Sequence, residues 1–104
     1  MVTEVRGSST RSVPRLAQNS PNPFHSETSI QYRVPGRGRV TLRVFDIHGR
    51  LVETLVDRVL DAGEYGATWN GRSRLGHLVG SGVYFCELET STGFRATRRM
   101  VRLK

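Results

Sequence analysis

Few residues in this chain of 104 amino acids could carry out catalysis, and they are scattered. Cys86 is the only cysteine, and it lies in the apolar run Gly82–Cys86, which favours a buried, inert thiol over a nucleophile. The three histidines, His25, His48 and His77, each fall in a turn-like stretch, so no base is expected beside the thiol. No paired carboxylates mark a cleft either. We therefore expect no catalytic residue and no enzymatic activity.

Oxygen ligands for a metal ion are a second possibility. Asp46, Asp57, Asp61 and Asn70 could bind calcium, but they lack the close, regular spacing of a dedicated calcium loop. Hydrogen bonds that cap turns are the favoured interpretation of these four side chains, with a calcium site as the alternative. The glycine-rich stretch 71–82 has no lysine in the register of a phosphate-binding loop. No cofactor is therefore expected.

Positive charge is the strongest chemical signal, because 16 Lys and Arg against nine Asp and Glu give a formal net charge of +7, and no acidic residue follows Glu89. The favoured interpretation of the basic end is structural, because charge on an edge strand prevents pairing with other chains. The alternative is a recognition strip, either for an acidic groove of a protein partner or for an anionic surface glycolipid. Nucleic acid is not expected as a partner, because no aromatic residues lie between the arginines. The strip consists of Arg95, Arg98, Arg99, Arg102 and Lys104.

Short segments with alternating apolar and polar residues hold these side chains, which is typical of β-strands with one buried face. Turns that contain glycine or proline separate them roughly every 8 to 12 residues, as in β-sandwiches. We therefore predict an all-β, immunoglobulin-like Greek-key β-sandwich of about seven antiparallel strands. The expected strands are a short one near Leu16, then Ser29–Val34, Arg39–Phe45, Tyr65–Trp69, Val83–Leu88 and Phe94–Leu103.

Two of these strands have unusual faces. The segment Val83–Leu88 is apolar on both faces, apart from Glu87, which predicts a central strand. In the last strand, Arg98 and Arg102 are expected to share one face with Met100, and Arg99 to lie on the other. The basic strip is therefore expected on an edge strand with charge on both faces.

The segment Leu51–Leu60 is ambiguous. Its apolar residues recur at three-to-four spacing, which by periodicity alone indicates an amphipathic helix of two turns. Valine is frequent in it, the segment is short, and its neighbours are strands, all of which favour a strand. We predict a short strand over Val52–Val56 followed by an irregular arm, with the helix as the alternative.

A rigid turn and one tryptophan are expected to organise the core. The prolines of Pro21-Asn22-Pro23-Phe24 exclude a helix, and we interpret this motif as a plug in which Phe24 caps the core, rather than as a ligand site. Trp69 is the expected core anchor, with an exposed sugar-stacking platform as the alternative. The two layers are predicted to close over Ile30, Leu42, Trp69 and Phe85.

Several short motifs follow one another in a characteristic order. They centre on Pro21, Asn22, Pro23, Phe24, Asp46, Gly49, Trp69, Gly71, Gly82 and Tyr84, ahead of the basic end. The ordered set closely resembles the immunoglobulin-like carboxyl-terminal modules known as type A sorting domains of the type IX secretion system, which are related to the immunoglobulin-like domain of the flagellar hook-capping protein. The resemblance covers about Arg15 to Lys104. Asn70 departs from it, because relatives usually carry an aspartate there.

The resemblance implies a non-catalytic C-terminal module of a larger secreted bacterial protein, acting in secretion sorting or cell-surface anchoring. Its implied partners are an export apparatus or the domains of its own parent protein. Two other functions stay open: a structural assembly unit of cap, filament or surface-layer type that self-associates through strand edges, and, less favoured, a carbohydrate-binding accessory domain.

The expected organisation is a flexible lead-in or linker remnant over residues 1–14, followed by the immunoglobulin-like module over residues 15–104. No run approaches the roughly 18 apolar residues of a transmembrane helix, so no transmembrane segment is expected. The first residues also lack the apolar core of a signal peptide. We expect the signal on an upstream part of the parent protein.

Overall fold

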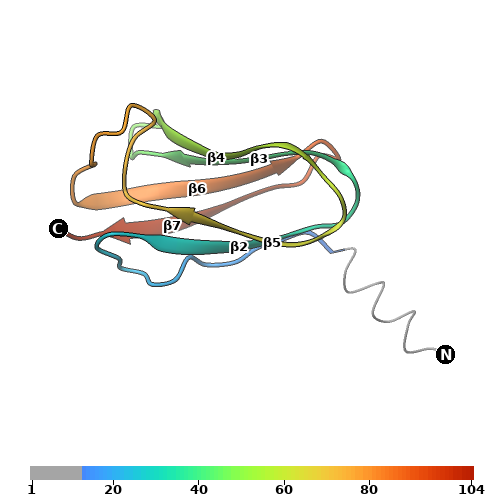
Figure 1. Cartoon of the computed structure of the whole chain (residues 1–104), viewed down its shortest axis with the longest axis horizontal. Coiled ribbons are helices and arrows are strands. Elements are labelled where there is room, and N and C mark those ends of the chain that lie inside the picture. Colours follow the sequence, from blue (N-terminus) through green and yellow to red (C-terminus); the bar gives the residue numbers. More distant parts are fainter. Residues whose placement is uncertain (1–12) are drawn as a thin grey trace.

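Strands and connecting loops make up the part of the chain that the structure describes, residues 13–104, in a computed structural model (Figure 1). Within these residues there is no helix with the length and apolarity needed to cross a membrane. The predicted lead-in over residues 1–14 lies outside the described residues, except for its last two positions. The strands are β1 (Arg15–Leu16), β2 (Thr28–Val34), β3 (Gly38–Phe45), β4 (Leu51–Leu60), β5 (Gly63–Trp69), β6 (Gly82–Thr90) and β7 (Arg95–Arg102).

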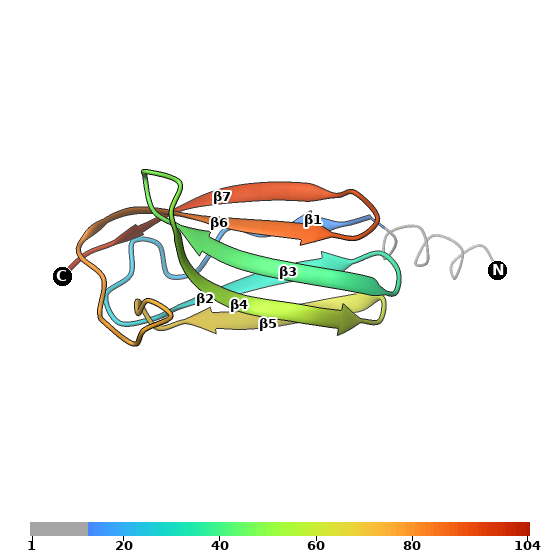
Figure 2. The same ribbon diagram turned by 90° about the horizontal axis from the view of Figure 1, so that it is seen from above.

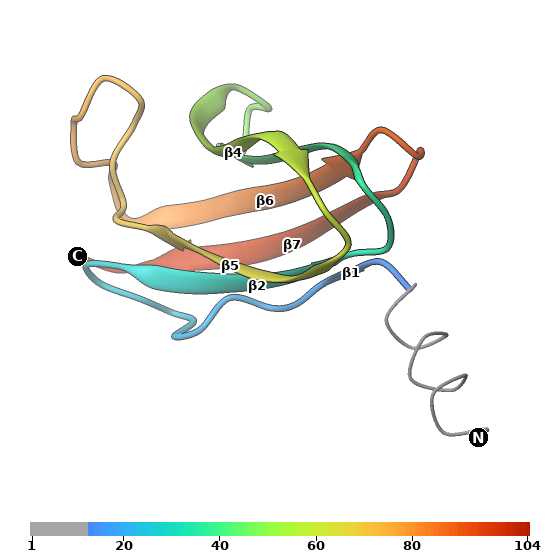
Figure 3. The same ribbon diagram turned by 45° about the vertical axis from the view of Figure 1, so that its right-hand side comes forward.

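These strands form two antiparallel sheets that pack face to face (Figures 1 and 3). One sheet has the order β1-β2-β5 and the other has the order β4-β3-β6-β7. The chain therefore changes sheet between β2 and β3, between β4 and β5, and between β5 and β6. Crossings of this kind give the Greek-key connectivity of β-sandwiches. The predicted all-β sandwich is confirmed, and β6 is central in its sheet as expected.

The core lies between the two sheets and follows the predicted alternation in β2, β3 and β5. Every second residue of β2 and β3 is buried, including Ile30 and Leu42. Trp69 ends β5 with 1% of its surface exposed, and its ring packs against Phe24 and Tyr84 at centroid distances of 5.5 and 5.3 Å. Removing these apolar and aromatic surfaces from water is the main driving force for closing the two layers.

The expectation that Phe85 belongs to the core is wrong. Tyr84, Cys86 and Leu88 are the buried residues of β6, so Phe85 lies on the opposite, outer face and is only half-buried. The physical reason is that the run Val83–Cys86 is apolar at every position, so alternation there defines two sets of side chains without saying which set meets the other sheet. Glu87 and Glu89, further along the strand on the face of Phe85, mark that face as the outer one.

The ambiguous segment is a strand, not a helix, and it is longer than predicted. β4 covers all of Leu51–Leu60, and its pairing with β3 shifts register twice. The shifts leave Val52 and Leu55 as extra residues on the β4 side. Each β-bulge of this kind changes which face the following residues occupy. Two bulges in one strand therefore produce an apolar spacing that imitates a helix.

Candidate recognition surface

The basic residues of β7 lie on both faces of the strand, as expected from the sequence, so they do not form one continuous strip. Met100 is fully buried and marks the side of β7 that faces the core. Arg98 and Arg102 share that side with Met100, as the spacing predicted. Arg95 and Arg99 lie on the outer side and are exposed. The two pairs of arginines therefore have different surroundings.

The two inward-facing arginines bind carbonyl groups of distant segments. Arg98 Nε donates to the carbonyl oxygen of Leu16 in β1 at 2.8 Å, which links the two sheets at their edge. Arg102 is 4% exposed, and its Nη1 donates to the carbonyl oxygen of Val79 at 2.8 Å. Nothing in the sequence signals that Arg102 is buried, because its burial depends on the loop between β5 and β6 folding over it.

The two outward-facing arginines differ in whether a carboxylate forms an ion pair with them. Arg95 lies 3.1 Å from Glu89 and 3.7 Å from Glu87, and the hydrogen bond and charge of Glu89, followed by the charge of Glu87, raise the pKa of Arg95. The guanidinium of Arg99 has no hydrogen-bond or ion-pair partner among residues 13–104. Lys104 follows the strand and is exposed. Arg99 is therefore a cation of β7 that is available to a partner.

On the outer face of the four-stranded sheet, a row of apolar side chains lies next to Arg99. Phe45, Phe85 and Arg99 are register partners on β3, β6 and β7, so their side chains lie side by side. Val83 and Val101 form the neighbouring pair on the same face. All four apolar residues are half-buried. This surface was not predicted from the sequence, although the apolar run Val83–Cys86 was a signal for it.

The main-chain edge of β7 is partly covered by the segment that follows β1, which Figure 2 shows beside β7. Phe24 donates its backbone N–H to the carbonyl of Val101 at 3.0 Å and accepts the N–H of Leu103 at 2.9 Å. The side chain of Asn22 accepts the N–H of Val101 at 2.9 Å, and that of Gln18 donates to the carbonyl of Arg99 at 2.7 Å. Pairing with another chain is therefore blocked at this end of the edge.

The proline motif forms this cover, and its aromatic residue enters the core. The peptide bonds before Pro21 and Pro23 are both cis. Phe24 has no exposed surface and packs on Trp69. The motif thus seals the end of the sandwich from which the β5–β6 loop projects (Figure 3).

The remaining motif residues lie in turns at the same end of the molecule. Asp46 Oδ1 accepts the backbone N–H groups of His48 and Arg50 at 2.9 and 3.0 Å, and Gly49 takes a φ of 79° in that turn. The hydroxyl of Tyr84 donates to the carbonyl of Gly80 at 2.9 Å. Gly82 begins β6 with its backbone nearly extended, and Gly71 follows Trp69 in the long loop.

The four candidate calcium ligands are engaged with protein groups. Asp46 and Asn70 cap turns through backbone N–H groups, as predicted. Asp57 and Asp61 instead pair with arginines, at 2.8 Å from Arg39 in the case of Asp57. Among residues 13–104, no three His, Cys, Asp or Glu side chains lie close enough together to hold a metal ion.

The only cysteine lies in the core. Cys86 is 1% exposed, and burial, with a smaller contribution from the charge of Glu87, raises the pKa of its thiol to about 12. The thiolate needed for nucleophilic attack is therefore almost absent at neutral pH. The histidines, all exposed, lie in loops or turns.

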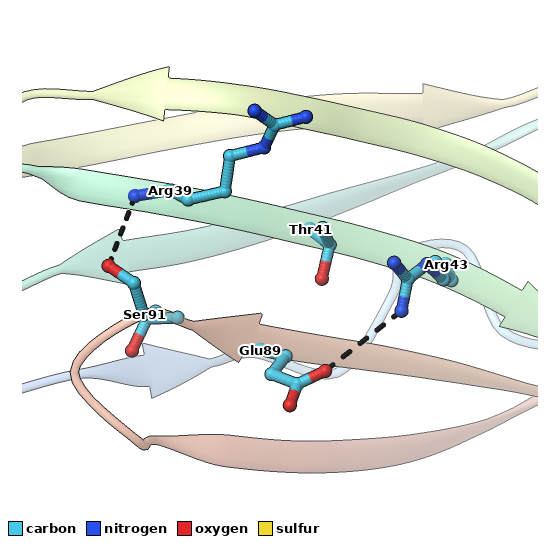
Figure 4. A pocket seen from close by; sticks show the side chains of 6 residues that line it. Arg39, Thr41, Arg43, Glu89 and Ser91 are labelled. Atoms are coloured by element: carbon cyan, nitrogen blue, oxygen red, sulfur yellow. Dashed lines mark hydrogen bonds and ion pairs between the residues drawn. The ribbon is translucent and has the colours of Figure 1, made fainter.

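A shallow groove of about 170 Å³ crosses the outer face beyond the apolar row (Figure 4). Arg43 lies 3.9 Å from Glu89 across it, and the backbone N–H of Arg39 donates to Ser91 Oγ at 3.1 Å. Arg39 also pairs with Asp57. The charges of the groove thus neutralise one another, which leaves Arg99 and the apolar row as the distinctive part of this face.

The sequence profile of one protein family matches residues 20–102, and that family is described as the secretion system C-terminal sorting domain. The chain belongs to this family. Sorting domains are non-catalytic modules of secreted proteins that direct type IX secretion and surface attachment, so the predicted resemblance, function and bacterial cell-surface location are confirmed. The export machinery recognises these domains.

Solved structures with the same fold include proteins of secretion and of the flagellum. Dimeric latent PorU from Porphyromonas gingivalis superposes with a TM-score of 0.69 at 20% identity, over 88% of this chain and 9% of that one. PorZ from the same organism, described as an essential surface component of the type IX secretion system, gives 0.61 at 21% identity, over 94% and 12%. FlgD from P. aeruginosa gives 0.59 at 20%, over 86% and 73%. At this identity the likeness concerns the fold alone. The sorting domain spans about a tenth of the PorU and PorZ chains, and no curated protein sequence matches it.

Proposed function

We propose that the export machinery recognises this sorting domain on the outer face of the four-stranded sheet, at the row of Phe45, Phe85 and Arg99. The observation that carries the proposal is the guanidinium of Arg99, which has no partner among residues 13–104 and lies beside two half-exposed aromatic rings. Aromatic and arginine side chains supply much of the binding energy at protein interfaces, provided that they become desolvated.

The outer face is a better candidate surface than the main-chain edge of β7, because backbone groups of that edge already have hydrogen-bond partners. Phe24 and Asn22 already occupy the outward backbone groups of Val101, so a partner gains few hydrogen bonds there. The side chains on the outer face, by contrast, remain available for contact with a partner. Among residues 13–104, the guanidinium of Arg99 on this face has no partner. A basic and apolar surface of this kind is complementary to an acidic groove with an apolar floor.

A reporter fusion tests the proposal in a bacterium that carries the type IX secretion system. The 104-residue chain is fused behind an exported fluorescent protein, and the reporter on the cell surface is quantified. We expect Arg99→Gln and Phe85→Ser each to lower surface delivery severalfold, because each removes a contact from the row. Arg95→Gln is the matched control, since it removes the same charge from the same face of β7 at a guanidinium that already pairs with Glu89.

Thermal unfolding of the purified variants separates loss of recognition from loss of folding. A variant that unfolds near the wild-type temperature but is not delivered supports the proposal. Wild-type delivery of a folded Phe85→Ser/Arg99→Gln double variant would overturn it, and the membership of the family would be unaffected.

A further inference from the structure

A pocket at the end of the sandwich lies apart from the outer face and gathers positive charge. It has a volume of about 500 Å³ and is formed by the segment before β2, the β5–β6 loop, the end of β7 and the residues that follow it. The loop projects from this end of the molecule, beside the last residues of the chain (Figure 3). Three basic side chains line the pocket, those of Arg72, Arg102 and Lys104, against one acidic side chain, that of Glu27.

The guanidinium of Arg102 is incompletely satisfied, although the residue is almost wholly buried. Its Nη1 donates to the carbonyl of Val79, but its Nε is buried and has no hydrogen-bond partner. Its Nη2 likewise has no partner among residues 13–104. Buried polar atoms in proteins are nearly always paired, so an unpaired N–H of a charged group calls for a ligand.

The two unpaired nitrogens are on the same edge of the guanidinium, because Nη1, which is bound to Val79, points to the other side. Nε is enclosed, so Nη2 is the donor of this edge that can reach an oxygen atom of a ligand in the pocket. Arg72 adds attraction, since among residues 13–104 only its Nη1 has a protein acceptor, the carbonyl of Gly76 at 2.9 Å. We propose that this pocket binds an oxyanion, with Nη2 of Arg102 as the donor and Arg72 and Lys104 as flanking cations.

Asn70 offers a sharp test because it lines the same pocket and is exposed. Its Oδ1 accepts the backbone N–H of Arg72 at 3.1 Å, a bond that an aspartate keeps. Asn70→Asp therefore adds a negative charge without removing the turn cap. Gln31→Glu is the matched control, since it adds the same charge on an exposed position of β2 that does not line the pocket.

The experiment titrates the 104-residue chain with inorganic phosphate and with acetate at constant ionic strength, and follows the Nε–H signal of Arg102 by ¹H–¹⁵N NMR. We expect a saturable shift with at least one oxyanion and none with chloride. Asn70→Asp should weaken binding roughly tenfold, because it places a like charge beside the ligand, and Gln31→Glu should change it less than about twofold. Absence of saturation, or equal weakening in both variants, would overturn the proposal.

A second experiment tests whether a bound phosphate belongs to a lipid headgroup or to a soluble molecule. The chain is sedimented with vesicles of phosphatidic acid, again with both variants. Sedimentation that Asn70→Asp reduces far more than Gln31→Glu assigns the phosphate to a lipid headgroup. Equal sedimentation of both variants, together with saturation by free phosphate, assigns it to a soluble ligand. Both results support the oxyanion site, which does not depend on the proposed recognition of the outer face.

Discussion

Arg102 and Gly71 are in such close contact that no side chain fits between them. A Cβ atom built on Gly71 would lie 2.8 Å from Nε of Arg102 and 3.3 Å from its Cδ. Gly71 also has a φ of 73°, a left-handed conformation that residues with a Cβ adopt at a cost. Glycine is thus required at position 71 for two reasons, the left-handed backbone conformation and the close contact with Arg102.

The first prediction follows from this contact. Gly71→Ala should lower the free energy of unfolding by about 2–4 kcal/mol, because it combines backbone strain with overpacking against Arg102. Urea unfolding followed by the fluorescence of Trp69 measures the change. Gly80→Ala in the same loop is the control, since its Cβ meets nothing within 4 Å, and it should change stability by no more than about 0.5 kcal/mol. Equal effects of the two substitutions would contradict the argument.

Phe24 is predicted to be a major contributor to stability. The ring has no exposed surface and packs on Trp69, so Phe24→Ala should cost about 3–5 kcal/mol through lost burial and a cavity. Phe24→Leu fills part of that cavity and should cost less. Chemical unfolding of both variants, beside Leu75→Ala at a position that is 77% exposed, provides the measurement. A loss below about 1 kcal/mol for Phe24→Ala would show that the plug is not part of the core.

Cys86 is predicted to be unreactive in the folded protein. Because burial raises the pKa of its thiol to about 12 from an ordinary value of 9.0, iodoacetamide at pH 8 should alkylate it only after unfolding. The same shift makes stability depend on pH. Between about pH 9 and 12 the unfolded chain loses the thiol proton before the folded protein does, so the free energy of unfolding falls as the pH rises.

A cysteine-free variant isolates this contribution, because Tyr32 and Tyr84, whose pKa values burial also raises, act in the same direction. Cys86→Ala should therefore lose less stability above pH 9 than the wild-type protein does. Parallel pH profiles of the two proteins, or rapid alkylation of the native thiol, would refute the assignment.

Asp46 is predicted to stabilise the β3–β4 turn as a carboxylate. The backbone N–H of Arg50 is the main cause that lowers the pKa of Asp46, with further contributions from His48 and the side chain of Arg50. Its contribution is therefore complete above the ordinary pKa of 3.8 and is lost as the pH falls through the lower value of the folded state. Asp46→Ala should lower the thermal midpoint at pH 7, and Asp46→Asn, which keeps the acceptor oxygen, should lower it less. A midpoint of Asp46→Ala equal to that of the wild type would contradict this role.

The strands themselves could be predicted because their signals are local. Alternation of apolar residues over Thr28–Val34 and Gly38–Phe45, together with the turn at Asp46–Gly49, specifies strands and reversals through interactions between near neighbours. The family motifs, which combine such turns with Trp69, were also visible without a structure.

Which face of β6 meets the core was not predicted. Phe85 and Cys86 are both apolar, and the acidic Glu87 and Glu89, which share the face of Phe85, are the local signal that marks the outer side. In β7, Met100 marks the inward face, but no local signal shows that Arg102 on that face becomes enclosed. Alternation fixes only that neighbours point to opposite sides, whereas burial depends on where the other sheet and the β5–β6 loop lie. The sequence alone determined a sandwich of short strands with a basic end. Packing between distant segments decided that Arg102 is enclosed beside Gly71 while Phe85 and Arg99 face outward, because only that packing removes one side of each strand from water.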